Sequence, residues 1–493
     1  MIDTIIRDVE ILDGTGAAPR TGDVGVQDGR LLVDPAQTEA TETLDGRGLA
    51  LAPGFIDVHT HDDFAAVLHP DMAFKVRGGV TTCVVGNCGL GAAPFPQASV
   101  MARAFHPNQP LPRWDGYAGY LSHLDGHRPS VNIAVLVGHG TLRLAAMGSA
   151  ARPPDDSELG TMRELLEEGL EAGAVGLSSG LIYEPGRHAK TEELIELAST
   201  MRGTQGLYAT HMRDEGNHLL ESVQEAIDIG RRAGVGVQIS HHKASGRAAW
   251  GLVERSLALI DAAQQAGLNV HADQYPYTAG STVLSAVYRP GRFGTGSDEL
   301  TPDDVVIASA NGHPEWEGRS ISQLADDLGV DPDQVAGQVL DACPGATVIL
   351  HSMSEEDVQT VMRHSSTMIG SDGIPTLEGR PHPRLYGTFA RVLGHYCRDL
   401  DLFPLNEAVY RMTGFPASKF GFTDRGEIRD GLAADLVLFD PKRIIDVGTF
   451  ASPNRYPEGI YKVWVNGELT VDGADHTGAR AGGPLRQTSR SDH

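Results

Sequence analysis

At 493 residues the chain is long enough for a large barrel, an accessory domain and a full hydrophobic core. Hydrophobic residues make up 41% of it and charged residues 21%, which is ordinary for a globular protein. The net charge of −25 is spread along the chain and argues against a nucleic-acid partner, because phosphates require a basic surface.

Residues 1–53 read as short strands separated by turns, and Pro53-Gly54 ends this segment. The opening MIDTIIRDVEILDG is acidic and lacks the apolar stretch of a secretory signal. No apolar run in the chain reaches the ~20 residues that span a bilayer. We therefore expect a cytoplasmic protein with no membrane partner, in which residues 1–53 form part of a small β-domain.

From residue 54 the pattern changes to strands that alternate with helices. Eight short apolar runs end in polar residues: IDVH, TCVVGN, IAVLVG, AVGLSS, LYATH, VGVQIS, LNVHAD and TMIGSD. Between them lie helical stretches such as 159–170, whose leucines and Met162 recur on one face. Eight strands interleaved with helices predict an α/β fold, a (β/α)8 TIM-like barrel over residues 54–420.

Two segments lie outside this alternation. Too many residues separate LNVHAD from TMIGSD for one crossover, so we expect residues 284–345 to form an inserted subdomain. After residue 420 the strands GEIRDG, ADLVLFDP and YKVWVNGELTVDG follow one another between turns. We expect residues 421–485 to complete the small β-domain, as a sandwich, with residues 1–53.

The ends of the predicted barrel strands carry a set of metal-binding side chains. Side chains alternate along a strand, so His59 and His61 point to the same side. The other members follow predicted strands 2, 5, 6 and 8: Cys88, His211, His241 and Asp372. Residues at these strand ends converge in a TIM barrel. Cys and His ligands suit zinc, and a catalytic zinc takes three of them, here Cys88, His211 and His241.

Several of these assignments have alternatives. His241 and His242 are adjacent, so only one of them can face the barrel mouth, and we assign that place to His241. The other cysteines, Cys83, Cys343 and Cys397, are sparse and irregularly spaced, and we interpret them as buried structural residues. Asp372 could cap a helix, but its place beside the metal set favours a general base that takes a proton from water and returns it to the leaving nitrogen.

Together these segments resemble the D-aminoacylase (N-acyl-D-amino-acid deacylase) family of the metal-dependent amidohydrolase superfamily. The similarity covers nearly the whole chain and includes PGFIDVHTHDD, GNCG, GLSSGLIYEPG, THMRDEG, ISHHKASG, DQYPYTAGST, GSDGIP, RPHPRLYGTF and GLAADLVLFDP. HxH is common in the superfamily, whereas GNCG, ISHHK and RPHPR are selective. The resemblance implies zinc-dependent hydrolysis of N-acyl-D-amino acids to a carboxylate and a free D-amino acid.

The resemblance also implies residue roles. It implies one zinc tightly held by Cys88, His211 and His241, with His59, His61 and Asp372 at a weaker second metal position. It places five residues around the carboxylate of the small-molecule substrate: Tyr183, Lys243, Tyr275, Ser281 and Arg384. Strand 4 has no lysine that could be carbamylated to bridge two metals, which fits the cysteine-containing subgroup.

Three alternatives to this function stay open. A cyclic amide or imide hydrolase would carry the missing strand-4 lysine. A deaminase would use a proton-shuttling glutamate near strand 5, for which Glu215 is the candidate. A non-catalytic paralogue is the third, because a fold does not determine a function. The sequence does not reveal the side-chain or acyl preference or the oligomeric state.

Overall fold

The computed structural model describes residues 1–37, 39–107 and 109–487. An eight-stranded parallel sheet forms its centre, in the order β18-β12-β11-β10-β9-β8-β7-β6. The strands are β6 Phe55–Asp57, β7 Val80–Val85, β8 Asn132–Gly138, β9 Gly176–Gly180, β10 Leu207–His211, β11 Gly236–Ile239, β12 Val270–Gln274 and β18 Thr367–Ile369. These eight strands coincide with the eight predicted runs. They confirm the predicted (β/α)8 barrel.

The barrel closes between its first and last strands just beyond their ends. Thr60 and Gly373 form a parallel bridge there. The amide of Asp372 donates to the carbonyl of His59 at 2.7 Å. The seam therefore runs directly through the predicted metal-binding segment.

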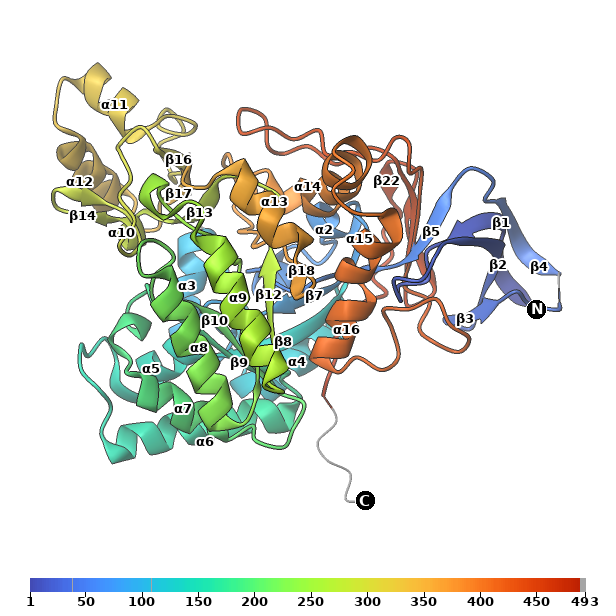
Figure 1. Ribbon diagram of the computed structural model, residues 1–493, viewed down its shortest axis with the longest axis horizontal. Coiled ribbons are helices and arrows are strands. Elements are labelled where there is room, and N and C mark those ends of the chain that lie inside the picture. Colours follow the sequence, from blue (N-terminus) through green and yellow to red (C-terminus); the bar gives the residue numbers. More distant parts are fainter. Residues whose placement is uncertain (38, 108, 488–493) are drawn as a thin grey trace.

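Helices surround the barrel (Figure 1). Those between β6 and β10 are α1 Ala65–Leu68, α2 Ala73–Val76, α3 Phe95–Phe105, α4 Gly116–Gly126, α5 His139–Met147, α6 Asp156–Ala172, η1 Gly186–His188 and α7 Thr191–Ser199. The later ones are α8 Leu219–Ala233, η2 Arg247–Ala249, α9 Leu252–Gln265, α13 Glu355–Arg363, α14 Arg384–Arg391, η3 Val392–Asp399, α15 Leu405–Met412 and α16 Gly414–Phe420. Among all the residues that the structure describes, no helix is long and apolar enough to span a membrane.

Helix α6 shows how local sequence signals produce one of these elements. Asp155 and Glu158 form a capping box at its start, which satisfies free backbone amides and is worth about 1 kcal/mol. Met162 and Leu166 are buried against the barrel, on the apolar face that the spacing predicts. Gly173 ends the helix with φ 112°, a conformation that favours glycine.

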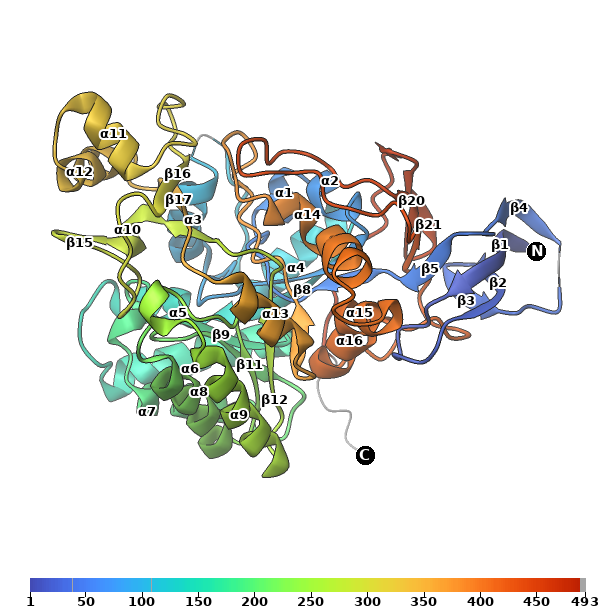
Figure 2. The ribbon, with the colours of Figure 1, turned by 45° about the horizontal axis from the view of Figure 1, so that its top comes forward.

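Both ends of the chain contribute to a second, nine-stranded sheet. Its strands are β1 Ile2–Ile11, β2 Arg20–Gln27, β3 Arg30–Val33, β4 Ala40–Asp45, β5 Ala50–Pro53, β19 Leu436–Phe439, β20 Ile460–Val465, β21 Glu468–Asp472 and β22 Asp475–His476. The two halves join where β5 pairs antiparallel with β19. Strands β1–β4 project from one end of the molecule in both ribbon views (Figures 1 and 2).

A third unit lies at the opposite end of the molecule (Figure 2). It comprises β13 Gly280–Val283, α10 Leu284–Val287, β14 Tyr288–Arg289, β15 Arg292–Phe293, β16 Val305–Ser309, α11 Ile321–Leu328, α12 Pro332–Ala342 and β17 Thr347–Leu350. Strands β13 and β17, which flank the predicted insertion 284–345, pair with each other, and β17 also pairs with β16, in the order β13-β17-β16. The domain boundaries 1–53, 54–420 and 421–485 remain a prediction.

Candidate metal centre

The barrel brings the six side chains predicted to bind metal into one buried cluster. His59 and His61 follow β6, Cys88 follows β7, and Asp372 follows β18. His211 is the last residue of β10, and His241 follows β11. Three overlapping groups have their ligand atoms within 4.8 Å of one another: His59, His61 and Cys88; Cys88, His211 and His241; and His59, His241 and Asp372.

Cys88 lies at the centre of the cluster. Its Sγ is 3.4 Å from Nε2 of His59 and 3.7 Å from Nε2 of His241. It is also 3.8 Å from Nδ1 of His211. Burial disfavours ionisation of this thiol, but the three imidazoles outweigh burial and hold the pKa of Cys88 well below its usual range. A thiolate among three imidazoles is a donor set that suits zinc.

The carboxylate of Asp372 bridges the histidines and a cation. Its Oδ1 lies 3.4 Å from Nε2 of His59 and 3.2 Å from Nε2 of His61. Its Oδ2 is 2.9 Å from the guanidinium of Arg384. Burial raises the pKa of Asp372, but Arg384 and the histidines outweigh this and hold it well below the ordinary value. Asp372 is therefore an ionised carboxylate at neutral pH.

Three residues of the cluster have left-handed backbone conformations. The φ angles are 54° at Cys88, 36° at His241 and 49° at Asp372. This region costs a non-glycine residue about 1–2 kcal/mol. Such strain concentrates at functional sites, where the surrounding structure maintains it. Its occurrence at three strand ends that face one another points to a site selected for its geometry.

The loop that carries Cys88 is held by a serine of strand β9. Ser178 donates from its Oγ to the carbonyl of Gly86 and accepts from the amide of Gly89 at 3.0 Å. These contacts fix both sides of Cys88. Ser178 thus supports the cysteine in the strand that has no lysine available for carbamylation.

His242 takes no part in the cluster. Its Nε2 lies 2.9 Å from Oγ of Ser256 in α9, on the opposite side of the strand from His241. Burial, as the main cause, lowers the pKa of His242 to about 4. The structure therefore places His241 toward Cys88 and His242 toward the helical layer.

The sequence analysis missed Asp273, a carboxylate at the end of β12. Its Oδ1 is 3.2 Å from Nδ1 of His59 and accepts the amide of His241 at 2.8 Å. A histidine whose Nδ1 proton is held by a carboxylate presents its Nε2 lone pair to a metal. Asp273 ends the run LNVHAD, in the same place as the predicted ligands, and this position was the available signal.

Glu215 and Lys243 form a second support beneath the cluster. Glu215 Oε1 lies 3.0 Å from Nδ1 of His241 and accepts Nζ of Lys243 at 2.7 Å. Its Oε2 lies 3.7 Å from Nε2 of His211. The Lys243 ammonium also lies 2.8 Å from Nδ1 of His241 and 3.0 Å from the carbonyl of that residue. Lys243 is therefore held against Glu215 and His241, and its contact with substrate stays a prediction.

A buried hydrogen-bond network that the sequence did not predict joins the first and last strands of the barrel. Lys75 donates to Asp57 at 2.7 Å and to Oγ of Ser371 at 2.8 Å. Ser371 also donates to Asp57 at 2.6 Å. All three are buried. They connect the strand ends that carry His59 and Asp372.

Arg384 and Tyr275 present unused donors beside the cluster. One nitrogen of Arg384 contacts Asp372 and the carbonyl of Ser281, the latter at 3.1 Å. Its Nε and Nη1, and the hydroxyl of Tyr275, are buried without a hydrogen-bond partner among the described residues. The guanidinium lies 4.4 Å from the centroid of the Tyr275 ring. Unsatisfied buried donors are costly, so these three indicate a place for a polar ligand.

The remaining predicted residues border a cavity of about 240 Å³ that opens beside His61. Tyr183 and Ser281 line it, and the hydroxyl of Tyr183 lies 3.0 Å from Oγ1 of Thr282. The ring of Tyr183 is 5.1 Å from that of His211. The cavity therefore connects the metal-binding cluster with the surface of the third unit.

Comparisons with known proteins show what the whole chain is similar to. A model of an amidohydrolase family matches residues 42–471. A D-aminoacylase from Alcaligenes xylosoxydans xylosoxydans is 41% identical over 501 residues, 99% of this chain and 98% of that protein. One similar structure is an N-acyl-D-glutamate deacylase from Bordetella bronchiseptica, complexed with zinc and a phosphonate mimic of the tetrahedral intermediate. It is 39% identical with a TM-score of 0.89, and the match covers 98% of this chain and 99% of that chain. Another is a D-aminoacylase structure described by its binuclear metal centre, with one-metal activation and second-metal attenuation. It is 40% identical with a TM-score of 0.88, and the match covers 99% of this chain and 100% of that chain.

Proposed function

The chain belongs to the amidohydrolase family, and on that premise we propose that it hydrolyses N-acyl-D-amino acids, with zinc as its metal, to a carboxylate and a free D-amino acid. The observation that carries the proposal is the juxtaposition of two features. A buried Cys and His cluster lies beside a buried guanidinium with two unused donors. The first suits zinc, and the second suits the carboxylate that an N-acyl amino acid carries next to its amide.

Cys88, His211 and His241 would hold one zinc tightly, and His59, His61 and Asp372 a second metal more weakly. When bound, zinc would lower the pKa of a water to about 7 and polarise a carbonyl. Asp273, 3.2 Å from Nδ1 of His59, and Glu215, 3.0 Å from Nδ1 of His241, set the orientation of these two histidines. The D-aminoacylase described by one-metal activation and second-metal attenuation supports this division of the site.

Asp372 is the general base in this proposal. It is an ionised carboxylate, and its closeness to His59 and His241 in one potential metal group supports a role in accepting a proton from the attacking water. The same carboxyl then delivers the proton to the leaving nitrogen. Arg384, bound to its Oδ2, limits Asp372 to one orientation.

Arg384 and Tyr275 bind the substrate carboxylate through one of the two unused Arg384 donors, Nη1 or Nε, and the Tyr275 hydroxyl. A charge-assisted hydrogen bond from the guanidinium holds the carboxylate and so fixes the amide relative to Asp372. Ser281 and Tyr183 border the cavity that opens beside His61, and the carbonyl of Ser281 accepts from Arg384. Lys243 acts on the site through its contacts with Glu215 and His241.

The test is hydrolysis of matched substrates by the purified, zinc-loaded protein. N-acetyl-D-leucine and N-acetyl-L-leucine are compared with a hydantoin and with adenine, which represent the cyclic amide hydrolase and the deaminase. The proposal requires release of D-leucine well above the other three reactions. Preferred turnover of the L-enantiomer, the hydantoin or adenine would refute it.

A further inference from the structure

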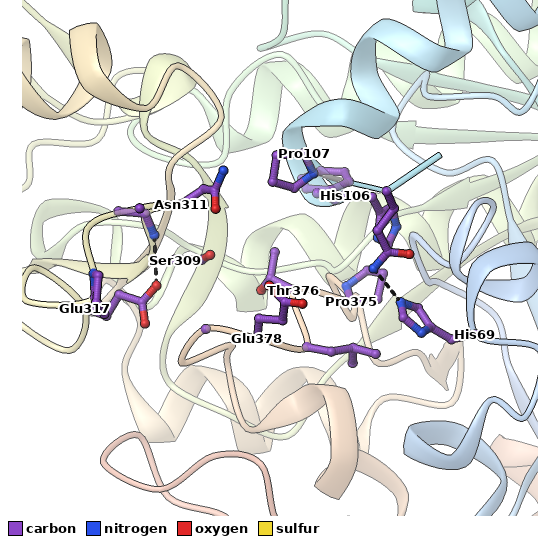
Figure 3. Close-up of a pocket in the computed structure, with 16 residues that line it drawn as sticks. His69, His106, Pro107, Ser309, Asn311, Glu317, Pro375, Thr376 and Glu378 are labelled. Carbon is purple, nitrogen blue, oxygen red and sulfur yellow. Dashed lines mark hydrogen bonds between the residues drawn. The ribbon is translucent and has the colours of Figure 1, made fainter. Parts of the chain in front are cut away.

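Two cavities lie next to each other at the mouth of the barrel. The first, of about 240 Å³, begins at His61; its lining includes the apolar side chains Leu90, Ile182, Val283 and Ile374, and the oppositely charged Glu184 and Arg289. The second, of about 210 Å³, is bordered by polar side chains that include His69, His106, Asn311, Glu317 and Thr376 (Figure 3). Of the six predicted metal-binding residues, His61 borders the first cavity, and none of the six borders the second.

A thin wall separates the two cavities. On one side of the wall, Ala104 faces the first cavity and His106 faces the second. On the other side, Ile374 faces the first cavity and Thr376 faces the second. Phe105, the last residue of α3, is the one side chain among the described residues that borders both. Its ring centroid lies 6.4 Å from that of His61, so the wall lies close to the reacting groups.

The first cavity is bordered both by Ser281, whose carbonyl accepts from Arg384, and by Leu90 and Phe105, so different parts of a substrate can occupy it. Arg384 and Tyr275, the proposed carboxylate donors, follow β18 and β12. Leu90 and Phe105 belong to the connection after β7. With the carboxylate held on one side of the cluster, the acyl group on the other side of the amide extends toward Leu90 and Phe105.

We propose that Phe105 determines which acyl chains the enzyme accepts, by closing the first cavity off from the polar cavity behind it. This inference rests on the proposed function. With the ring in place, small acyl groups fit and longer ones meet the wall. Without it, the two cavities form one channel whose far end is polar.

The lining of the second cavity predicts what the far end would accept. Glu317 and Glu378 border it, and His106 contributes no positive charge because burial, and then His69, lower the pKa of His106 to about 4. In an opened channel, an acyl chain that ends in an ammonium is favoured and one that ends in a carboxylate is repelled. A substitution that only made the first cavity larger, without joining it to the second, would give no such charge preference.

The experiment compares acetyl, hexanoyl, 6-aminohexanoyl and adipoyl derivatives of D-leucine in wild type, Phe105→Ala, Phe105→Leu and Phe105→Trp. We expect Phe105→Ala to raise the hexanoyl-to-acetyl ratio of kcat/KM about tenfold or more, with 6-aminohexanoyl best and adipoyl not improved. Phe105→Leu should give a smaller gain, and Phe105→Trp none. Adding Ser309→Phe to Phe105→Ala, which fills the second cavity, should abolish the gain.

Val100→Ala, on the exposed face of the same helix, is the control and should leave every ratio unchanged. If ratios change by less than about twofold in Phe105→Ala and Phe105→Leu that retain zinc, Phe105 does not form the proposed wall. A gain with longer D-side chains instead of longer acyl chains overturns the acyl assignment. If wild type cleaves none of these amides, the proposed function itself is refuted, which is a distinct outcome.

Discussion

Replacing Arg384 by lysine tests the carboxylate site. The change keeps a positive charge near Asp372 but removes Nε and Nη1, the two unpartnered donors. Because Nε and Nη1 lie on different edges of the guanidinium, one of them can bind the carboxylate while Asp372 holds Nη2. A hydrogen bond to a charged group contributes about 1.5–3 kcal/mol. At about 1.4 kcal/mol per factor of ten, kcat/KM for N-acetyl-D-leucine should fall by about 10–10².

The assay includes a substrate without the carboxylate, N-(3-methylbutyl)acetamide, which is decarboxylated N-acetylleucine. Because Arg384 has no carboxylate to bind there, wild type and Arg384→Lys should differ much less on this amide. Arg391→Lys, in the same helix and paired with Asp446, is the matched control and should stay near wild type. Equal losses on both substrates, or a loss below about tenfold on N-acetyl-D-leucine, would show that Arg384 does not bind the carboxylate.

Three further predictions concern the metal and the residues that support it. Cys88→Ala should lose its zinc on dialysis whereas Cys343→Ala, outside the cluster, should keep it; zinc analysis that finds full occupancy in Cys88→Ala would contradict the ligand assignment. Glu215→Gln should weaken zinc binding about 10–100-fold, measured by competition with a chelator, and an unchanged affinity would remove Glu215 from the support of the histidines. Lys75→Met leaves buried carboxylates without their cation and should cost about 3–5 kcal/mol in the free energy of unfolding, measured with denaturant. The exposed Lys442→Met is its control, and equal stability of the two variants would contradict the argument.

Local sequence patterns predicted the barrel because each strand and helix carries its own periodicity. Because side chains alternate along a strand, the two-residue spacing of His59 and His61 predicted that they point to the same side. Positions at strand ends identified Cys88, His211, His241 and Asp372. The same rule that side chains alternate separated His241 from His242, although it left open which of them faces inward.

The supporting contacts could not be predicted because they join residues far apart in the chain. Asp273 and His59 are separated by 214 positions, and Lys75 and Ser371 by 296. The pairing of β13 with β17 likewise joins segments on both sides of the insertion. The resemblance implies a substrate contact for Lys243, but nothing in its local sequence indicates the contact that it makes with Glu215, 28 positions away.

The most direct test of the account is a titration of metal-free protein with zinc, with hydrolysis of N-acetyl-D-leucine followed at each addition. The account predicts no activity without metal and a linear rise in the rate of hydrolysis that ends at about one equivalent of zinc. The reason is that three ligands and an open position form one tight catalytic site. Full hydrolysis by metal-free protein, or no hydrolysis at any occupancy, would contradict it.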